Sequence, residues 1–454
     1  MNALLLELIQ KHHGAFKVTF SFSGTFMDQL EAYAPDVLES FQRLVATGQV
    51  ELLNETYGHS LAALKSKEEF AGMVKQHQDK IKQLFNGYQP KVFRNTELIY
   101  SDKIGAMVAD LGYKGILTEG AKHVLGWKSP NYVYQNSINS DLKVLLKNFR
   151  LSDDIAFRFS NKTWEDYPLT TDKFINWINA IPQSEQVLNL FMDYETFGEH
   201  QWAETGIFDF MRALPEAVFK HTNFGFSTPS EVIDKVPAVS PIHVPIPISW
   251  ADEERDLTAW LGNDLQDEAF DRLYELEAMV KKTKDPDLMR DWNYLQTSDH
   301  FYYMCTKFFS DGDIHSYFSP YDTPYDAFIN YMNVLSDFVL RVKGKIKELE
   351  TRSFGLRSSN QSSKENKATG MIADNQIILM DFPKSITLGI IREILVFYIP
   401  DIIFKGISHY LLQISILPQK SGFKLLSNPQ HIMHYQNLPI YIWSGPNSYN
   451  RDLN

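Results

Sequence analysis

Hydrophobic and polar positions follow two alternating patterns over the first 230 residues. Short runs rich in Val, Phe, Ile and Leu predict strands, and each is followed by a longer stretch whose apolar residues recur every three or four positions. Several of these longer stretches end at Gly, which is typical of a helix C-terminus. The predicted strands are residues 16–24, 49–55, 90–97, 113–120, 142–154 and 187–195, and the clearest predicted helices are residues 1–16, 27–48, 66–87 and 102–112.

Strands that alternate with helices predict βαβ units and a parallel sheet. The strands are mostly apolar, which indicates a sheet covered on both faces. Residues 240–345 are mainly helical in pattern. Near residue 350 the composition changes: residues 351–370 are rich in Ser, Asn and Lys and predict a linker, and the Ile-rich tail beyond them has no clear period.

Length and composition limit the class of protein. The chain has 454 residues, a net charge of -12 and one cysteine, Cys305. The negative charge argues against nucleic acid as the main partner. A single cysteine excludes an intramolecular disulfide framework and fits a reducing, cytoplasmic setting. No uncharged apolar run reaches the roughly 18 residues of a membrane span.

Acidic residues gather where the predicted strands end. Because catalytic groups of parallel α/β barrels project from the carboxyl ends of the strands, these residues predict one acidic mouth. The flagged residues are Glu55, His59, Glu97, Glu119, Asp153, Asp154, Asp193 and Glu195.

Two kinds of chemistry suit an acidic mouth in an aromatic-rich chain. Paired carboxylates without a metal suit glycoside hydrolysis. A carboxylate–histidine cluster suits a divalent metal and hydrolytic deacetylation. Neither H-x-x-x-H nor H-E-x-x-H occurs, which disfavours the metal alternative. A sugar-binding protein without catalysis is a third possibility.

Five segments together resemble glycoside hydrolase family 57, in its cytoplasmic α-amylase-like branch. They are "GQVELLNETYGHSL" (48–61), "KVFRNTELIYSD" (91–102), "FMDYETFGEH" (191–200), "FSTPSEV" (226–232) and "LQTSDHFYYM" (295–304), and the resemblance spans roughly residues 1 to 345. It implies an α/β fold, an incomplete (β/α)7 barrel with a C-terminal helical subdomain, and catalysis without a metal or other cofactor.

The resemblance also implies roles for individual residues. Glu97 corresponds to the nucleophile of a retaining mechanism at α-glucosidic bonds, and Asp193 to the general acid/base. The residues themselves did not rank these two above Glu55 or Glu195. Further residues are implied to line the sugar subsites: His59, Glu119, Trp202, Trp250 and Asp299.

The function expected from the resemblance is that of an α-amylase that cleaves α-1,4-glucosidic bonds in starch, glycogen or maltooligosaccharides. A 4-α-glucanotransferase or branching enzyme on the same site is the nearest alternative. An inactive glucan-binding relative is another. The sequence leaves the oligomeric state open.

The chain also departs from the family pattern. The family's first strand ends in His-Gln-Pro, and this tripeptide is absent. We therefore expect a barrel that lacks its first strand and has an unpaired sheet edge. The expected organisation is a catalytic barrel over residues 1–235, a helical subdomain over 236–350 that completes the substrate cleft, and a linker and tail of unknown role over 351–454. We do not expect the tail to supply the missing strand.

Overall fold

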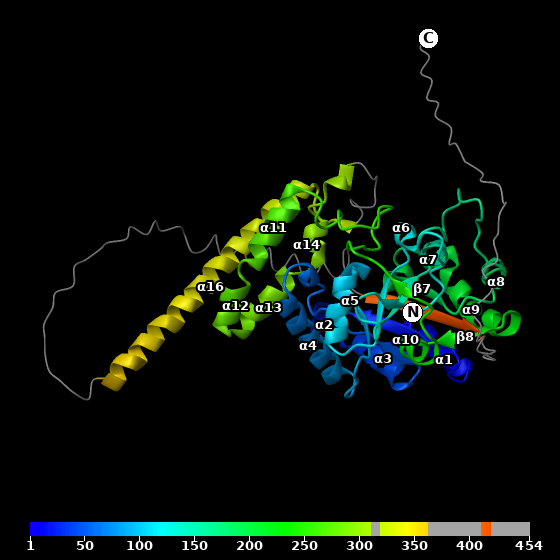
Figure 1. Ribbon diagram of the computed structural model, residues 1–454, viewed down its shortest axis with the longest axis horizontal. Coiled ribbons are helices and arrows are strands. Elements are labelled where there is room, and N and C mark those ends of the chain that lie inside the picture. Colours follow the sequence, from blue (N-terminus) through cyan, green and yellow to red (C-terminus); the bar gives the residue numbers. More distant parts are fainter. Residues whose placement is uncertain (310–317, 362–409, 419–454) are drawn as a thin grey trace, which may run out of the picture. The chain divides into compact units, whose positions relative to one another are not determined.

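A computed structural model describes residues 1–309, 318–361 and 410–418 of the chain (Figure 1). Its strands are β1 (Val18–Phe22), β2 (Val50–Leu52), β3 (Val92–Arg94), β4 (Gly115–Glu119), β5 (Tyr134–Asn136), β6 (Lys143–Lys147), β7 (Leu188–Asp193), β8 (Phe224–Ser227), β9 (Pro241–Ile242) and β10 (Tyr410–Pro418). The first nine helices are α1 (Asn2–Lys11), α2 (Gly24–Tyr33), α3 (Pro35–Ala46), α4 (Lys67–Leu84), α5 (Asp102–Asp110), α6 (Lys122–Leu125), α7 (Phe149–Ala156), α8 (Thr171–Asn179) and α9 (Ile207–His221).

The later helices are α10 (Pro229–Lys235), α11 (Asp264–Tyr274), α12 (Glu277–Thr283), α13 (Pro286–Leu295), α14 (Ser298–Tyr302) and α16 (Pro324–Gln361). Short 3₁₀ turns are η1 (Ala62–Leu64), η2 (Thr96–Leu98), η3 (Tyr194–Thr196), η4 (Ala203–Thr205) and η5 (Thr306–Phe309). Although α16 has 38 residues, neither it nor another helix of the described ranges is both long and apolar enough to cross a membrane.

Six parallel strands form most of a barrel. β1 pairs with β2, β3 with β4, and β4 with β6, all in parallel. Two seams join these pairs. The Arg94 N–H donates to the Asn54 carbonyl at 2.9 Å between β2 and β3, and the Asn148 N–H donates to the Asn189 carbonyl at 2.9 Å between β6 and β7. The fold is therefore α/β, with the parallel strands that the alternation of strands and helices predicts and the barrel that the family resemblance implies.

The seventh position of the barrel is filled by β10, from the tail. β10 lies between β1 and β7 and runs antiparallel to both, and its far end also pairs with β8. Figure 1 shows it in orange among neighbours from the first half of the chain. The expectation that the tail stays out of the sheet and leaves an unpaired edge is thus wrong for residues 410–418. The rest of residues 362–454 lies outside the described residues.

Side-chain alternation explains how β10 fits. Leu412, Ile414 and Ile416 face the outer apolar layer, while Gln413 and Ser415 are buried on the opposite face of the strand. The Gln413 amide donates to Ser415 Oγ, which donates to Asn189 Oδ1 of β7, both at 2.9 Å. The strand therefore satisfies the period of two of a buried sheet, although the surrounding Ile-rich tail shows no clear period.

The inside of the barrel has an apolar layer below a polar one. Alternate residues of a strand face the same side, so each inward apolar residue is followed two positions later by an inward polar one. The apolar layer contains Leu53, Val92, Leu117, Leu145 and Phe191. The residues two positions further are Glu55, Arg94, Glu119, Lys147 and Asp193. A row of charged side chains therefore lies at the carboxyl ends of the strands.

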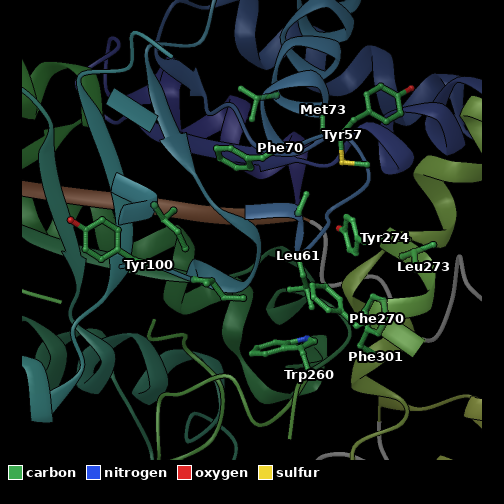
Figure 2. Close-up of a cluster of buried hydrophobic side chains, with 14 of the residues drawn as sticks. Tyr57, Leu61, Phe70, Met73, Tyr100, Trp260, Phe270, Leu273, Tyr274 and Phe301 are labelled. Atoms are coloured by element: carbon green, nitrogen blue, oxygen red, sulfur yellow. The ribbon is translucent and has the colours of Figure 1, made fainter. Parts of the chain in front are cut away.

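Helices α11 to α16 pack against the barrel through aromatic side chains. Figure 2 shows Tyr57 and Leu61, from the loop after β2, in one cluster with Phe270 and Tyr274 of α11 and Phe301 of α14. A buried hydrogen bond adds to this contact: the Trp292 indole N–H donates to Glu69 Oε1 of α4 at 2.6 Å. Helices α11 to α16, called the helical part below, thereby hold the loops that carry the charged residues.

Two local predictions are corrected. We expected residues 142–154 to form one strand, but β6 ends at Lys147 and Asn148 caps α7 by accepting the Leu151 N–H. Asp153 and Asp154 are therefore helical and do not end a strand. Residues 27–48 were expected to form one helix, but the chain breaks at Ala34, because the residue before a proline is disfavoured in the helical conformation.

Candidate active site

Glu97 is held by donors from three different parts of the chain. It lies in η2, just after β3, and is buried. His59 Nε2 lies 3.1 Å from Oε1, and Ser298 Oγ donates to the same oxygen at 3.2 Å. The Trp250 indole N–H donates to Oε2 at 2.7 Å. Both carboxylate oxygens therefore accept hydrogen bonds, as an ionised carboxylate requires when it is buried.

The environment of Glu97 favours its charged form. Burial alone would raise the pKa of Glu97, but the hydrogen bond and charge of His59, the charge of Arg94 and the hydrogen bond from Trp250 together lower it below its ordinary value. The backbone of Glu97 has φ 56° and that of His59 has φ 50°. Left-handed conformations of this kind are costly for residues other than Gly and concentrate at functional sites.

Asp193 has the opposite environment. It is the last residue of β7, and its Oδ1 atom is buried without a hydrogen-bond partner among the described residues. Burial and the negative charge of Glu97 raise the pKa of Asp193 to about 7, although Arg94, Lys147 and His59 oppose the shift. The two carboxyl groups are therefore electrostatically coupled: near neutral pH Glu97 is ionised, while Asp193 still holds a proton in about half of the molecules.

Trp250 contacts two cations of the charged row, Arg94 at the end of β3 and Lys147 at the end of β6. Its ring lies 5.5 Å from the Arg94 guanidinium and 5.3 Å from the Lys147 ammonium, measured to the ring centroid. A Trp ring attracts cations over its face, so it stabilises both buried charges. Because the same side chain also donates to Glu97, its contacts explain why it is half-buried at this mouth.

Glu119, at the end of β4, belongs to a neighbouring ion cluster. It accepts the Gly120 N–H at 2.7 Å. Lys147 Nζ lies 3.8 Å from its Oε2, and Arg255 Nε lies 4.0 Å from the same atom. Burial nevertheless raises the pKa of Glu119. Lys147 also contacts Asp153 at 3.1 Å, so this aspartate reaches the site from α7.

The remaining two predicted residues lie differently. Asp299 follows Ser298 on α14 and is half-buried. Trp202 lies on the loop after β7, directly before η4, and is 64% exposed. The structure therefore brings His59 and Trp250 into direct contact with Glu97. Glu119 lies beside these residues, in the ion pair with Lys147. The Trp202 ring is exposed to solvent.

Three residues at the site were missed by the sequence reasoning. Arg94 and Lys147 are inward-facing cations at the ends of β3 and β6, and Ser298 donates to Glu97 from the helical part. The signal for the cations was present, since each follows an apolar residue by two positions in a predicted strand. The contact of Ser298 had no local signal, because it joins residues 201 positions apart.

An α/β barrel that carries one ionised and one protonated carboxyl group at the carboxyl ends of its strands has the arrangement that glycoside hydrolases use. Among the described residues, no group of three or more His, Cys, Asp or Glu side chains is arranged to hold a metal ion. Residues 1–245 match the model of glycosyl hydrolase family 57. The chain belongs to this family and is a glycoside hydrolase.

A known protein agrees with this assignment. A protein of Methanocaldococcus jannaschii named "Putative alpha-amylase" is 42% identical over 395 residues, which cover 84% of this chain and 83% of that protein. The crystal structure of a GH57-type branching enzyme from Pyrococcus horikoshii has a TM-score of 0.53 at 14% identity and covers 76% of this chain and 85% of its own.

A crystal structure of 4-alpha-glucanotransferase from Thermococcus litoralis has a TM-score of 0.49 at 16% identity, over 66% of this chain and 51% of its own. At these identities the Pyrococcus horikoshii structure supports the barrel fold alone.

Proposed function

We propose that this chain hydrolyses α-1,4-glucosidic bonds of an α-glucan, with retention of the anomeric configuration. Starch, glycogen and maltooligosaccharides are the substrates we expect, and the cytoplasm is the expected compartment. The observation that carries the proposal is the unequal pair of carboxyl groups: donors and cations favour the charged form of Glu97, and burial beside a negative charge favours the protonated form of Asp193. The name of the Methanocaldococcus jannaschii relative supports the substrate class.

The proposed reaction has two steps. Asp193 gives its proton to the glycosidic oxygen, the bond from that oxygen to the anomeric carbon breaks, and the Glu97 carboxylate bonds to the same carbon. Asp193, now ionised, then takes a proton from water while the water oxygen attacks the anomeric carbon and releases Glu97. Two inversions give net retention. The raised pKa of Asp193 suits both of its roles near neutral pH.

Sugar binding is proposed for the five further residues. Trp250 and Trp202 offer aromatic faces to sugar rings, and Glu119 and Asp299 offer carboxylates to hydroxyl groups. His59 lies against Glu97, next to the position proposed for the sugar that reacts there. These roles rest on the resemblance to the family together with the positions described above.

Maltoheptaose tests the proposal. The wild-type protein should give shorter sugars only, and proton NMR of the first products should show the α-anomer at the new reducing end. Glu97→Gln should give none, while Glu51→Gln, which changes a buried glutamate of β2 outside the site, should behave as the wild type. Products longer than maltoheptaose would instead establish a glucanotransferase. No products from folded wild-type protein would exclude hydrolysis by this chain.

A further inference from the structure

The imidazole of His59 lies between two buried carboxylates. Its Nε2 atom is 3.1 Å from Glu97 Oε1, and its Nδ1 atom is 3.5 Å from Glu55 Oε1. An ionised carboxylate only accepts hydrogen bonds, so the hydrogen bond to Glu97 requires a proton on Nε2, and the approach of the Glu55 carboxylate to within ion-pair distance favours a second proton on Nδ1. A neutral imidazole carries one such proton, whereas the imidazolium carries two. The geometry therefore suits a doubly protonated His59.

Glu55 is placed so that one oxygen is left to face His59. Its Oε2 atom accepts from Ser21 Oγ and from Arg94 Nη1, each at 2.9 Å. Oε1 faces the imidazole. The carboxylate thus pairs with Arg94 on one side and with His59 on the other, and the side chains of all three residues are buried.

The charges around His59 balance only when it is a cation. The groups that act on it are Glu55 from the loop after β2, Glu97 from η2, Arg94 from β3, Asp193 from β7 and His77 from α4. Buried ions are stable when they are paired. Arg94 neutralises Glu55, so an ionised Glu97 next to a protonated Asp193 needs His59 as its counter-ion. Burial lowers the pKa of His77, which leaves it neutral.

We propose that Glu55 is a positioning residue that keeps His59 doubly protonated, so that His59 holds Glu97 in the ionised form and the mobile proton of the site stays on Asp193. This inference rests on the roles proposed for Glu97 and Asp193. It assigns a function to Glu55, which contacts neither the anomeric carbon nor the leaving group in the proposed reaction.

Titration behaviour agrees with this geometry. Burial would lower the pKa of His59, but the charge and hydrogen bond of Glu55 and the hydrogen bond to Glu97 raise it to about 9. Burial would raise the pKa of Glu55, but His59 and Arg94 lower it to about 2. His59 is thus charged, and Glu55 ionised, across the neutral range.

The loop that carries His59 is fixed by the helical part. The His59 carbonyl accepts the Ser298 N–H at 3.0 Å, and the Gly58 carbonyl accepts from Thr297 Oγ1 at 3.0 Å. A Cβ atom on Gly58 would lie 2.4 Å from the Asn293 carbonyl oxygen, so the close approach needs glycine here. The backbone contacts therefore hold the imidazole of His59 in place. The main effect of Glu55 is then on the protonation state of His59 and not on its position.

Nitrogen NMR of the full chain with ¹⁵N-labelled histidine measures that charge directly. The signals of His59 are assigned as those lost in His59→Gln. In the wild type both ring nitrogens should be protonated at pH 7. In Glu55→Gln the imidazole should lose its second proton at a pH about one unit or more lower, because an opposite charge at this distance shifts a pKa by about 1–3. A neutral His59 in the wild type at pH 7 overturns the inference.

Kinetics supplies the second readout. Glu55→Gln should lower kcat on maltoheptaose roughly 10- to 100-fold with a small change in KM, as expected for loss of a charge-assisted contact to the nucleophile. Glu51→Gln, four residues earlier on the same segment, should leave kcat unchanged. Because Glu55 acts through His59, the double variant Glu55→Gln/His59→Gln should be no slower than the slower single variant. Losses that multiply in the double variant contradict the inference.

The two proposals fail in different ways. If the wild type is inactive on maltoheptaose, the proposed function fails, yet the NMR comparison of the wild type with Glu55→Gln still decides the charge of His59. If Glu55→Gln does not fold, the wild-type NMR measurement still decides, because a neutral His59 at pH 7 overturns the inference. Active wild-type protein whose His59 stays doubly protonated in Glu55→Gln overturns the role of Glu55 while the proposed function stands.

Discussion

The two sides of the mouth treat their carboxyl groups differently. On the side of β2 and β3, Glu97 accepts hydrogen bonds from His59, Trp250 and Ser298. On the side of β7, Asp193 has a buried oxygen without a hydrogen-bond partner among the described residues, and the negative charge of Glu97 raises its pKa. One barrel can therefore hold an ionised carboxyl group beside one with a raised pKa, by supplying donors to the first and withholding them from the second.

The largest effect on activity should come from substituting Glu97 and Asp193 one at a time and comparing substrates with different leaving groups. Glu97→Gln should bring activity to background on every substrate, because no covalent intermediate forms. Asp193→Asn should cost about 10²–10⁴-fold on maltoheptaose, the typical value of a general acid. It should spare the first step on an aryl α-maltoside with an acidic phenol, which leaves without protonation.

A burst of phenol from Asp193→Asn, followed by slow turnover, checks this difference. Equal losses in both variants on both substrates would show that the two carboxyl groups do not have the separate roles proposed here.

The next effect concerns the strand beside Asp193. In β10, Leu411 is paired with Asp193, and Ile414 is buried in the outer layer. Ile414→Ala should therefore lower the free energy of unfolding by about 2–5 kcal/mol, the usual cost of truncating a buried aliphatic side chain. Denaturant unfolding measures it, with the exposed Leu340→Ala as control. An unchanged unfolding midpoint for Ile414→Ala would exclude β10 from the folded core.

A substitution of Trp250 tests the hydrogen bonding of Glu97 without changing Asp193. Trp250→Phe keeps an aromatic ring but removes the N–H that donates to Glu97 Oε2. A hydrogen bond to a charged group contributes about 1.5–3 kcal/mol, so kcat/KM should fall roughly 10- to 150-fold. Trp260→Phe is the matched control, because Trp260 is buried in the apolar cluster of the helical part. Equal losses in the two variants would assign Trp250 a packing role only.

The smallest effect is a pH dependence. Because the proposed role of Asp193 is that of the acid in the first step and its pKa is raised to about 7, kcat/KM should fall as pH rises through that value, about tenfold for each further pH unit. The lowered pKa of Glu97 keeps the nucleophile ionised on the acid side, so activity should persist below pH 5. A profile that stays flat from pH 6 to pH 9 would contradict the protonated state proposed for Asp193.

The local pattern of the chain determined much of the fold. Short apolar runs such as those in "ILTE" and "LFMD", and the helical period between such runs, predicted strands, helices and a parallel sheet, since these patterns reflect which faces are buried. The points where these runs end placed Glu119 and Asp193 at strand ends. The resemblance of five segments to glycoside hydrolase family 57, and not their periodicity, separated Glu97 and Asp193 from Glu55 and Glu195.

The surroundings of these carboxyl groups come from contacts between distant parts of the chain. Ser298 and Trp250 reach Glu97 across 201 and 153 residues of chain, and no local pattern encodes such contacts. The same holds for β10, whose nine residues fit between β1 and β7 because both edges there are unpaired without it. The pKa of a carboxyl group depends on burial and on charges within a few ångströms, so the sequence identified the carboxyl groups, and folding alone lowered the pKa of Glu97 and raised that of Asp193.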